Sequence, residues 1–494
     1  MIIKGFVMRF RLIFSLVGFM TVLGGFTMMF PCFLDWLDGN SASAGVFALS
    51  AALTVASGLI VWLLTDTKSA PLRTKEMFLT TSLIWISFVF FSALPLYLLK
   101  LDISFAGALF EASSGLTTTG ATVLTNLDSL SKGVLFWRSL MHWMGGIGIL
   151  VVAIMILPTL HIGGMQLFNI ETSGESNRDS PTTIQNVSGV IGYFVFLTVV
   201  AFISLRLAGM DMFDAVNHAM SVVATGGFST HDDSIAYFNS PIIEWILAFF
   251  MFVGGFPLML GILIFHRHFN QIRNNEQIKV YCLFCFGVVF SLIFIRWYQV
   301  SFDNNQLSQI LRTTIFDALS IMTSTGFVID DYENWGAYAT VVFLLLMFVG
   351  GCTASTTGGI KIFRYTILFK TIHSKLKSAA RPYGVFIPRY GNKAVTEDVM
   401  SGVLVFFGLY ALCVALGTLI LSFYGLDLIT CLSGTVSMLS NMGPGLGDVI
   451  GPDKTFAALP EGVKAICAFL MIIGRLEFVA VFVLMMPFFW KKNI

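Results

Sequence analysis

Residues 110–123 read FEASSGLTTTGATV, and three later stretches repeat the pattern: VNHAMSVVATGGFST at 216–230, FDALSIMTSTGFVID at 316–330 and SGTVSMLSNMGPGLG at 433–447. Each stretch places small or hydroxylic residues around a central glycine when the four are aligned without gaps on Gly120, Gly226, Gly326 and Gly443. The glycines lie 106, 100 and 117 residues apart. This spacing is too regular for four unrelated turns, so we interpret the stretches as one structural unit repeated four times.

The composition predicts a membrane protein. Of the 494 residues 56% are hydrophobic and 12% are charged, whereas soluble globular chains carry about 25% charged residues. A bilayer core requires about 20 consecutive apolar residues per helix. Ten such stretches lie near 12–30, 44–64, 77–98, 134–157, 187–208, 242–265, 280–298, 338–369, 399–424 and 463–489.

Each repeat contains an apolar span, a helical run of about ten residues, the glycine turn and a second apolar span. A helix of ten residues extends about 15 Å, half of a hydrocarbon core of about 30 Å, so it enters halfway and the chain must return. The second spans carry a glycine pair or its counterpart: Gly145-Gly146, Gly254-Gly255, Gly350-Gly351 and Gly474-Arg475.

The predicted fold is an all-α polytopic membrane protein. It has four tandem helix–pore helix–filter loop–helix repeats around one pseudo-fourfold pore, plus two extra N-terminal transmembrane helices. The expected segments are 1–70 for those two helices, then 71–165, 180–270, 275–390 (with an intramembrane loop) and 394–494 for the four repeats.

Basic residues predict the orientation. The first apolar stretch follows Lys4, Arg9 and Arg11; a cleaved signal peptide is the alternative, but the apolar run is too long and no Ala-x-Ala site follows. With a cytoplasmic N-terminus, 20 of the 29 Lys and Arg residues fall in cytoplasmic segments, eight fall on the opposite side and Arg475 lies inside the last span. Both termini are therefore predicted to be cytoplasmic.

The four turns suit a filter for a monovalent cation. Backbone carbonyls from several strands around one axis can replace the water shell of K⁺, and glycine provides the φ > 0 that this requires. No turn carries a carboxylate, which a Ca²⁺ site would normally contribute. We predict K⁺ as the transported ion, with no organic cofactor. The predicted filter residues are Thr118, Thr119, Gly120, Ala121, Ala224, Thr225, Gly226, Gly227, Ser324, Thr325, Gly326, Phe327, Asn441, Met442, Gly443 and Pro444.

Polar groups stand a few residues before three of the turns. Glu111 and Asp317 occupy matching places, and Asn217 is aligned with them. Two roles remain open for these residues: they brace the filter without touching the ion, or they cap the start of the pore helix.

The motifs SGLTTTGATV, ATGGFST, TSTGF, SNMGPGLGDV, VGGCTASTTGGIKIFR and IGRLEF resemble those of the Trk/Ktr/HKT potassium transporter superfamily, in particular the TrkH/TrkG-type membrane subunits of the bacterial Trk potassium-uptake system. The resemblance covers the chain from about residue 77 to its end. It implies a pore made by one chain, a homodimer in the bacterial inner membrane, and gating by a cytosolic nucleotide-binding ring of TrkA-like RCK domains. No nucleic-acid partner is expected.

A gate is predicted in the eighth apolar span. Its glycines and hydroxyls favour a flexible loop in the ion path over a continuous lipid-facing helix, although a kinked helix is the alternative. The resemblance assigns this segment the role of intramembrane gating loop. Arg475 is predicted to project below the filter and to contact the loop carbonyls when the pore is shut, because a charge at this depth needs such partners. The loop residues are Gly350, Gly351, Cys352, Thr353, Ala354, Ser355, Thr356, Thr357, Gly358 and Gly359.

Other ionisable groups have two readings each. His142, His218 and Glu244 form a proton relay or, alternatively, are interfacial and capping groups. The eight basic residues between Lys361 and Lys393 attract anionic membrane lipid or dock the gating ring.

Two other functions would place different demands on the sequence. K⁺ uptake obligatorily coupled to H⁺ or Na⁺ would need carboxylates along the path, and the turns contain none. An intramembrane hydrolase would need a nucleophile and base or a metal-binding cluster inside the spans, but H-E-x-x-H is absent and the seven His are scattered. The sequence therefore favours a channel-like transporter that is not an enzyme.

Overall fold

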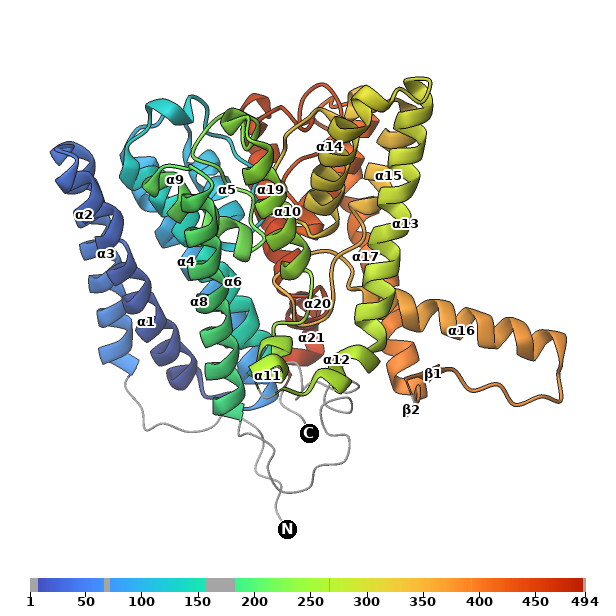
Figure 1. Ribbon diagram of the computed structural model, residues 1–494. Coiled ribbons are helices and arrows are strands. Elements are labelled where there is room, and N and C mark those ends of the chain that lie inside the picture. Colours follow the sequence, from blue (N-terminus) through green and yellow to red (C-terminus); the bar gives the residue numbers. More distant parts are fainter. Residues whose placement is uncertain (1–7, 66–71, 156–182, 266, 392, 492–494) are drawn as a thin grey trace, which may run out of the picture.

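The computed structural model describes residues 8–65, 72–155, 183–265, 267–391 and 393–491. These residues form a bundle of helices with a short hairpin, in which β1 (Arg389–Tyr390) pairs with β2 (Lys393–Ala394). Most long helices run from one end of the molecule to the other (Figure 1). The expected boundaries near residues 70, 165 and 180 lie outside the described residues, as do Lys4, Lys68, Arg178 and Lys492.

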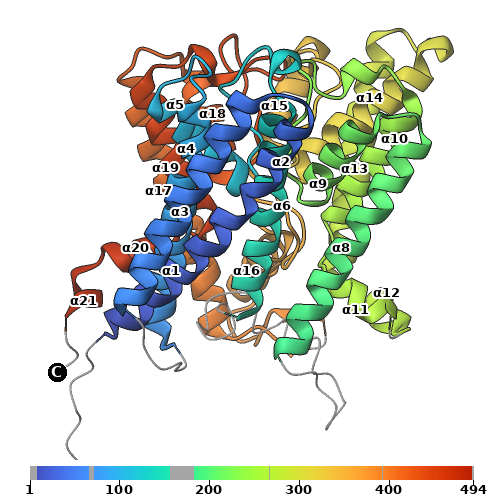
Figure 2. The same cartoon turned by 90° about the vertical axis from the view of Figure 1, so that its left-hand side faces the viewer.

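Two helical spans precede the repeats, as the sequence predicts. α1 (Phe10–Thr27) continues almost directly into α2 (Met29–Leu37), and α3 (Ser41–Thr65) returns beside them. Small residues permit this close packing: a Cβ on Gly58 would lie 2.8 Å from the carbonyl oxygen of Gly18. Figure 2 shows the pair on one flank of the molecule.

Four repeats follow, and each has the predicted order of long helix, pore helix, extended turn and second helix. The first repeat comprises α4 (Thr74–Leu98), α5 (Phe105–Leu116) and α6 (Lys132–Met155); the second α8 (Thr183–Leu207), α9 (Met212–Val223), α10 (Pro241–Gly254), α11 (Met259–Phe265) and α12 (Phe269–Asn274); the third α13 (Glu276–Gln299), α14 (Asn304–Met322), α15 (Ala337–Leu346) and α16 (Ile362–Ala380); the fourth α17 (Glu397–Ser422), α18 (Leu428–Ser440), α19 (Glu461–Arg475), α20 (Val479–Met485) and α21 (Pro487–Trp490).

The four connections from filter turn to second helix are also alike, since each contains a 3₁₀ turn. These turns are η1 (Leu127–Ser129), η3 (Ala236–Phe238), η4 (Tyr332–Trp335) and η5 (Phe456–Ala458). We call the end of the molecule that carries them the mouth end.

The pore helices share a capping signal. Side chains of Ser104, Asp211, Asp303 and Asp427 accept hydrogen bonds from backbone N–H groups in the first turns of α5, α9, α14 and α18, which satisfies donors that a helix start leaves free. α5 and α9 have 12 residues and α18 has 13, or about 18–20 Å at 1.5 Å per residue. With 19 residues α14 is longer than expected.

Three of the second helices are broken. α10 and α11 meet at an angle of 96°, residues 347–361 separate α15 from α16, and residues 476–478 separate α19 from α20. The unbroken spans predicted over 242–265 and 463–489 are therefore wrong, whereas the interruption predicted within 338–369 is confirmed.

The glycines of the second helices explain this architecture. A Cβ on Gly145 would overlap the carbonyl oxygen of Leu116 at the end of α5, and a Cβ on Gly474 would overlap the carbonyl oxygen of Leu439 in α18. Backbone therefore packs directly on backbone where a second helix passes its pore helix. Hydropathy reports the apolar length of such a segment but not where it bends.

The outer surface is suited to lipid. Among the described residues, six helices are long and apolar enough to cross a membrane, and the bent pair α10–α11 makes a seventh. Ten spans were expected, and the other three correspond to α6, to α15 with α16 and to α19 with α20. On α13, Leu283, Phe286 and Phe290 are 73%, 70% and 60% exposed along one face, which would be unfavourable in water.

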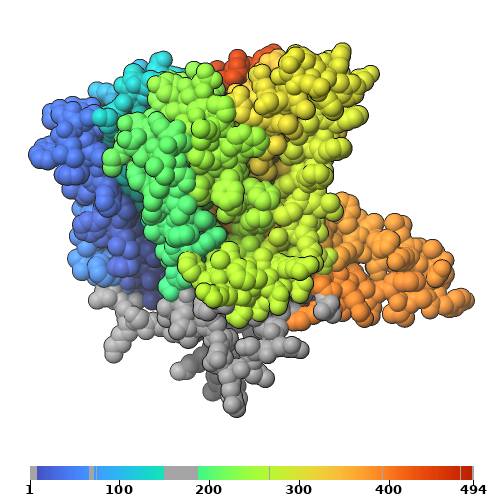
Figure 3. Space-filling view, in the orientation of Figure 1, coloured from blue at the N-terminus to red at the C-terminus, as the bar shows by residue number. Residues whose placement is uncertain are grey.

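One segment leaves the bundle. α16 and the chain that follows it extend sideways at the end opposite the mouth (Figures 1 and 3). This arm carries most of the basic residues predicted between Lys361 and Lys393, whereas Lys361 and Arg364 lie inside the bundle, where they contact Thr357 and Glu477. Its exposed side chains include apolar ones, such as Phe369 and Leu376.

Candidate cation-conduction site

The four filter turns converge and close into a ring. In each turn a residue with φ near +50° is followed two residues later by a glycine with φ between +83° and +103°. The pairs are Thr118 and Gly120, Thr225 and Gly227, Ser324 and Gly326, and Asn441 and Gly443. Alternation of this kind turns successive carbonyls toward one side of the strand, which explains why glycine is needed at the second position.

The ring is closed by contacts from each glycine to the next turn. A Cβ added at Gly120, Gly227, Gly326 or Gly443 would meet a carbonyl oxygen of the next repeat in cyclic order, and the fourth repeat meets the first. These oxygens belong to Gly226, Thr325, Met442 and Thr119, which occupy equivalent positions. The four hairpins therefore share one central line, as the sequence analysis expects.

The backbone angles correct the register of the second repeat. Gly226 does not have a positive φ, whereas Gly227 does, so the alignment on Gly226 is wrong by one residue. Ser221 then matches the serine six positions before the glycine in the other repeats, and its carbonyl oxygen accepts from the N–H of Gly226 as Ser114 accepts from Thr119. In the corrected alignment Ala224 falls at the end of α9, and Phe228 is equivalent to Ala121 of the first repeat.

Glu111 and Asp317 brace the strand that leaves the ring. Glu111 accepts hydrogen bonds from the N–H of Val123 at 2.9 Å and from the hydroxyl of Thr122 at 3.0 Å, and Asp317 accepts from the N–H of Ile329 at 3.2 Å. The helix starts are capped by other residues, so the capping role does not apply to these two acids.

Asn217 does not share the bracing position, because the corrected register places His218 there. The amide of Asn217 donates to the carbonyl of Phe213 within its own helix, at 2.7 Å. His218 instead contacts the hydroxyl of Ser229, on the strand after Gly227, at 3.0 Å. In the fourth repeat the hydroxyl of Ser433 accepts from the N–H of Leu446 at 2.9 Å.

Arg138 is a site residue that sequence reasoning missed. It is buried in α6, donates from Nε to Glu111 at 2.8 Å and from a terminal nitrogen to the carbonyl of Ser229 at 2.8 Å, and lies 4.0 Å from the ring centre of Phe228. It thus joins the brace of the first repeat to the filter strand of the second. A charged residue inside the apolar span 134–157 needs a buried partner, and this was the signal in the sequence that could have identified Arg138.

The glycine-rich segment 350–359 is a loop, not a kinked helix, and it lies against the deep edge of the ring. Thr356 contacts the hydroxyl of Thr225 at 3.2 Å and the carbonyl of Val223 at 3.3 Å. The N–H of Gly358 donates to the hydroxyl of Ser324 at 2.5 Å. A Cβ on Gly358 would overlap the carbonyl oxygen of Ser440. Three of the four repeats therefore touch this loop.

Arg475 makes the type of contact that was predicted. One terminal nitrogen donates to the carbonyl of Thr356 at 3.1 Å and the other to the carbonyl of Gly145 at 3.4 Å. The side chain is buried, and its Nε has no hydrogen-bond partner. Lys361 adds a second cation, since its ammonium donates to the hydroxyl of Thr357 at 3.0 Å.

The three residues for which a proton relay was the alternative to interfacial or capping roles bond to other groups. His142 contacts the hydroxyl of Ser221 at 3.2 Å, His218 makes the contact with Ser229 given above, and Glu244 pairs with Arg312 at 3.1 Å. None of these hydrogen bonds links one of the three residues to another, so the described geometry favours local roles over a relay.

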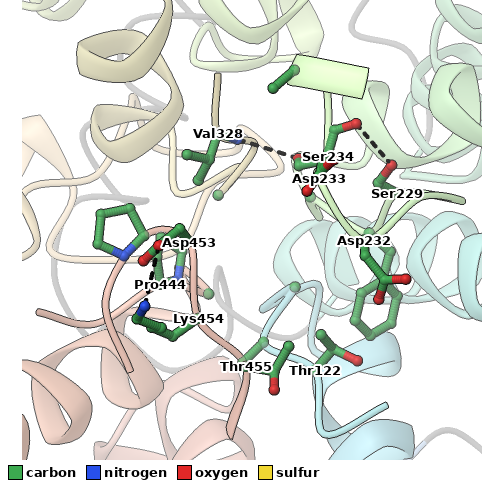
Figure 4. Close-up of a pocket in the computed structure, with 18 of the residues that line it drawn as sticks. Thr122, Ser229, Asp232, Asp233, Ser234, Val328, Pro444, Asp453, Lys454 and Thr455 are labelled. Carbon is green, nitrogen blue, oxygen red and sulfur yellow. Dashed lines mark hydrogen bonds and ion pairs between the residues drawn. The ribbon is translucent and has the colours of Figure 1, made fainter. Parts of the chain in front are cut away.

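On the mouth side of the ring lies a cavity of about 280 Å³. Residues from all four repeats surround it in Figure 4, including Thr122, Ser229, Val328 and Pro444. Its lining contains more carboxylates than cations, which raises the local concentration of cations. The carboxylates are Asp232, Asp233, Asp330, Asp331 and Asp453, and Arg138 and Lys454 offset two of them.

Comparison with known proteins agrees with this geometry. The TrkH family model, described as a cation transport protein, matches residues 43–492. The Trk system potassium uptake protein TrkI of Halomonas elongata is 38% identical over 454 residues, which are 92% of each chain. The Trk system potassium uptake protein TrkH of Escherichia coli K12 is 34% identical over 98% of this chain and 100% of that protein. The crystal structure of the potassium transporter TrkH from Vibrio parahaemolyticus matches with a TM-score of 0.90 and 30% identity over 98% of this chain and 100% of that one. Since these matches span all four filter turns, the chain belongs to the TrkH family of cation transport proteins.

Proposed function

We propose that this chain carries K⁺ into the bacterial cell across the inner membrane, through the ring formed by its four filter turns. The closed cycle of contacts from each filter glycine to a carbonyl of the next repeat is the observation that carries the proposal. Such a ring offers uncharged oxygens to a dehydrated monovalent cation. The names of the relatives, which are potassium uptake proteins of the Trk system, support K⁺ as the ion.

The loop 350–359 and Arg475 act as the gate. The loop contacts the deep edge of the ring through hydroxyl groups, and Arg475 binds its backbone at Thr356. A guanidinium beside the ion path repels cations, and a loop that is not part of a helix can move without unfolding one. In this proposal the contact between Arg475 and Thr356 holds the pore shut.

Regulation comes from a cytosolic ring of TrkA-like nucleotide-binding subunits, and the transporter is a homodimer. The mouth end faces the periplasm and both termini face the cytoplasm. The basic arm around α16 lies on the cytoplasmic side, where it meets anionic lipid or the regulatory ring. These statements rest on the excess of basic residues in the predicted cytoplasmic segments and on the family resemblance.

Obligatory coupling to H⁺ or Na⁺ is the second candidate. Glu111 and Asp317 are held away from the central line by backbone N–H groups, which favours channel-like flux. Vesicles that contain the chain with its regulatory ring, with a K⁺ gradient and no pH or Na⁺ gradient, separate the two: uptake is expected, and its absence would support coupling.

Complementation tests the proposal directly. A bacterium deficient in K⁺ uptake should grow at low external K⁺ with the native chain but not with Gly326→Ser, whose side chain would meet Met442 and Pro444. Gly287→Ala is the matched control, because a Cβ on that helical glycine of the same repeat meets open space. Growth with Gly326→Ser equal to that of the native chain would contradict the filter.

A further inference from the structure

His231 stands at the mouth of the pore, four residues after Gly227, and lines the cavity. Each of its two ring nitrogens faces a carboxylate. Nδ1 is hydrogen-bonded to Asp128, and Nε2 lies 3.3 Å from Oδ2 of Asp214. The imidazole stacks on Tyr237 with ring centres 3.5 Å apart and an angle of 9° between the planes. Its orientation is therefore fixed from three sides.

This arrangement requires a particular protonation state. Ionised carboxylates only accept hydrogen bonds, and a neutral imidazole has a single N–H, so only the imidazolium donates to both acids. Burial lowers the pKa of His231, but the hydrogen bonds that it donates to Asp214 and Asp128 outweigh this effect and raise the pKa above the usual 6.5. The imidazolium is thus present below the raised pKa, and its second hydrogen bond is lost as the pH rises through it.

The groups around His231 come from both of the first two repeats. Asp128 lies in η1, Asp214 and His218 in α9, and Tyr237 in η3, while Asp232 and Asp233 follow His231 in its own loop. His218 keeps both of its nitrogens on other partners, the carbonyl of Asp214 and the hydroxyl of Ser229. The charge of His231 is therefore balanced by carboxylates alone.

Deprotonation of His231 would not separate the two repeats. The N–H of Leu127 still donates to Asp232 at 2.8 Å, and Arg138 still binds the carbonyl of Ser229. What changes is the charge beside the cavity. With the proton, Asp128, Asp214 and His231 sum to one negative charge; without it they sum to two.

We propose that His231 is a proton-binding site in the outer mouth through which external pH sets the affinity of the pore for K⁺. This inference rests on the proposed function. Loss of the proton makes the mouth more negative, which raises the local K⁺ concentration, so the KM for uptake falls as the external pH rises. One unit charge beside a mouth that water and salt reach changes KM by about two- to threefold.

The test is Rb⁺ uptake by cells that lack other K⁺ transporters, measured at external pH 6 to 9.5. The native chain should show one step to lower KM with its midpoint above pH 6.5. His231→Gln should keep the low KM throughout, and His231→Lys should keep the high KM, because a lysine remains charged over this range. His268→Gln, at the opposite end of the molecule, is the control and should retain the native step. A native step in His231→Gln would overturn the proposal.

A second pair of variants separates charge from titration. Asp128→Asn removes one acid that holds the proton and should move the midpoint to lower pH. Asp233→Asn removes a charge from the same cavity without touching the hydrogen bonds of His231, so it should change KM at every pH and leave the midpoint in place. An unchanged midpoint in Asp128→Asn would contradict the proposed site.

Histidine NMR provides a readout that does not depend on transport. A ring signal that is absent from His231→Gln should titrate above pH 6.5 in the purified native chain, and a midpoint below 6.5 would overturn the inference. Absence of uptake by the native chain at every pH would contradict the proposed function instead. A native chain that transports with the pH profile of His231→Gln would overturn only the role of His231.

Discussion

The filter ring and the loop beneath it are built from similar small and hydroxylic residues, but they are held in different ways. Each filter glycine lies against the backbone of the next turn, and buried side chains such as Glu111 and Arg138 fix the strands that leave the ring. The loop 350–359 is instead attached to the turn between α10 and α11 by backbone hydrogen bonds, from Cys352 to Gly255 and from Leu258 to Ala354, and it contacts the ring through hydroxyl groups and Arg475. The comparison teaches that composition alone does not distinguish a turn that closes a ring from a loop that lies beside it; the partners of the backbone do.

The largest effect is expected where the ring depends on a buried ion pair. Arg138→Met leaves the carboxylate of Glu111 buried without its partner, which should lower the free energy of unfolding by about 3–5 kcal/mol. Thermal unfolding of the detergent-solubilised protein would measure this. The double variant Glu111→Gln with Arg138→Met should recover part of the loss, and a single variant as stable as the native chain would show that the brace is not needed.

The corrected register gives the next prediction. Gly227→Ala places a Cβ at φ +84° against the carbonyl of Thr325. A left-handed backbone costs a non-glycine residue about 1–2 kcal/mol, and the overlap adds to this, so Rb⁺ uptake should fall roughly 100-fold.

Gly226→Ala tests the same register from the other side. The atoms nearest to its Cβ would belong to the side chain of His142 and not to backbone, so the loss should be smaller and the second change His142→Ala should restore part of the uptake. Rescue of Gly227→Ala by His142→Ala would instead favour the original alignment on Gly226.

Arg475→Ala tests the loop. Hydrogen bonds from a charged group contribute about 1.5–3 kcal/mol, so removing those to Thr356 and Gly145 should raise the open fraction about tenfold or more. The expected result is Rb⁺ uptake by vesicles that contain no regulatory subunit, at a rate well above that of the native chain. Equal rates would exclude Arg475 from the gate.

The smallest effect is expected for one loop hydroxyl. Thr356→Val removes the contacts with Val223 and Thr225, which are worth about 1 kcal/mol in total, and should raise regulator-free uptake about fivefold. Thr340→Val, in α15 of the same repeat, is the control and should leave it unchanged. A reduced rate in Thr356→Val would mean that this hydroxyl supports conduction instead.

The repeat architecture could be predicted from the sequence because hydropathy and the recurrence of glycine are local signals. The register error at Gly226 arose because two adjacent glycines fit the same pattern, and only the closure of the ring decides which one adopts a positive φ. Ser221 itself was a clue to the shift, because it lies six residues before Gly227, and the other repeats have a serine six residues before their glycine.

The breaks in the second helices and the role of Arg138 could not be predicted from the sequence, for another reason. Both depend on residues far apart in the chain: Gly474 packs on Leu439, and Arg138 connects Glu111 with Ser229. A hydropathy profile records that a residue lies in an apolar run. The profile does not record which residue of another segment contacts it there.

All four quarters of the ring lie on one polypeptide, and this has a consequence for assembly. A pore built from separate subunits forms only where those subunits meet, so its abundance falls steeply when expression is low. Here the quarters are tethered, and closing the ring is a unimolecular step that proceeds at any dilution. A defective chain produced in the same cell can disrupt its own pore, but it cannot become part of the pore of another chain.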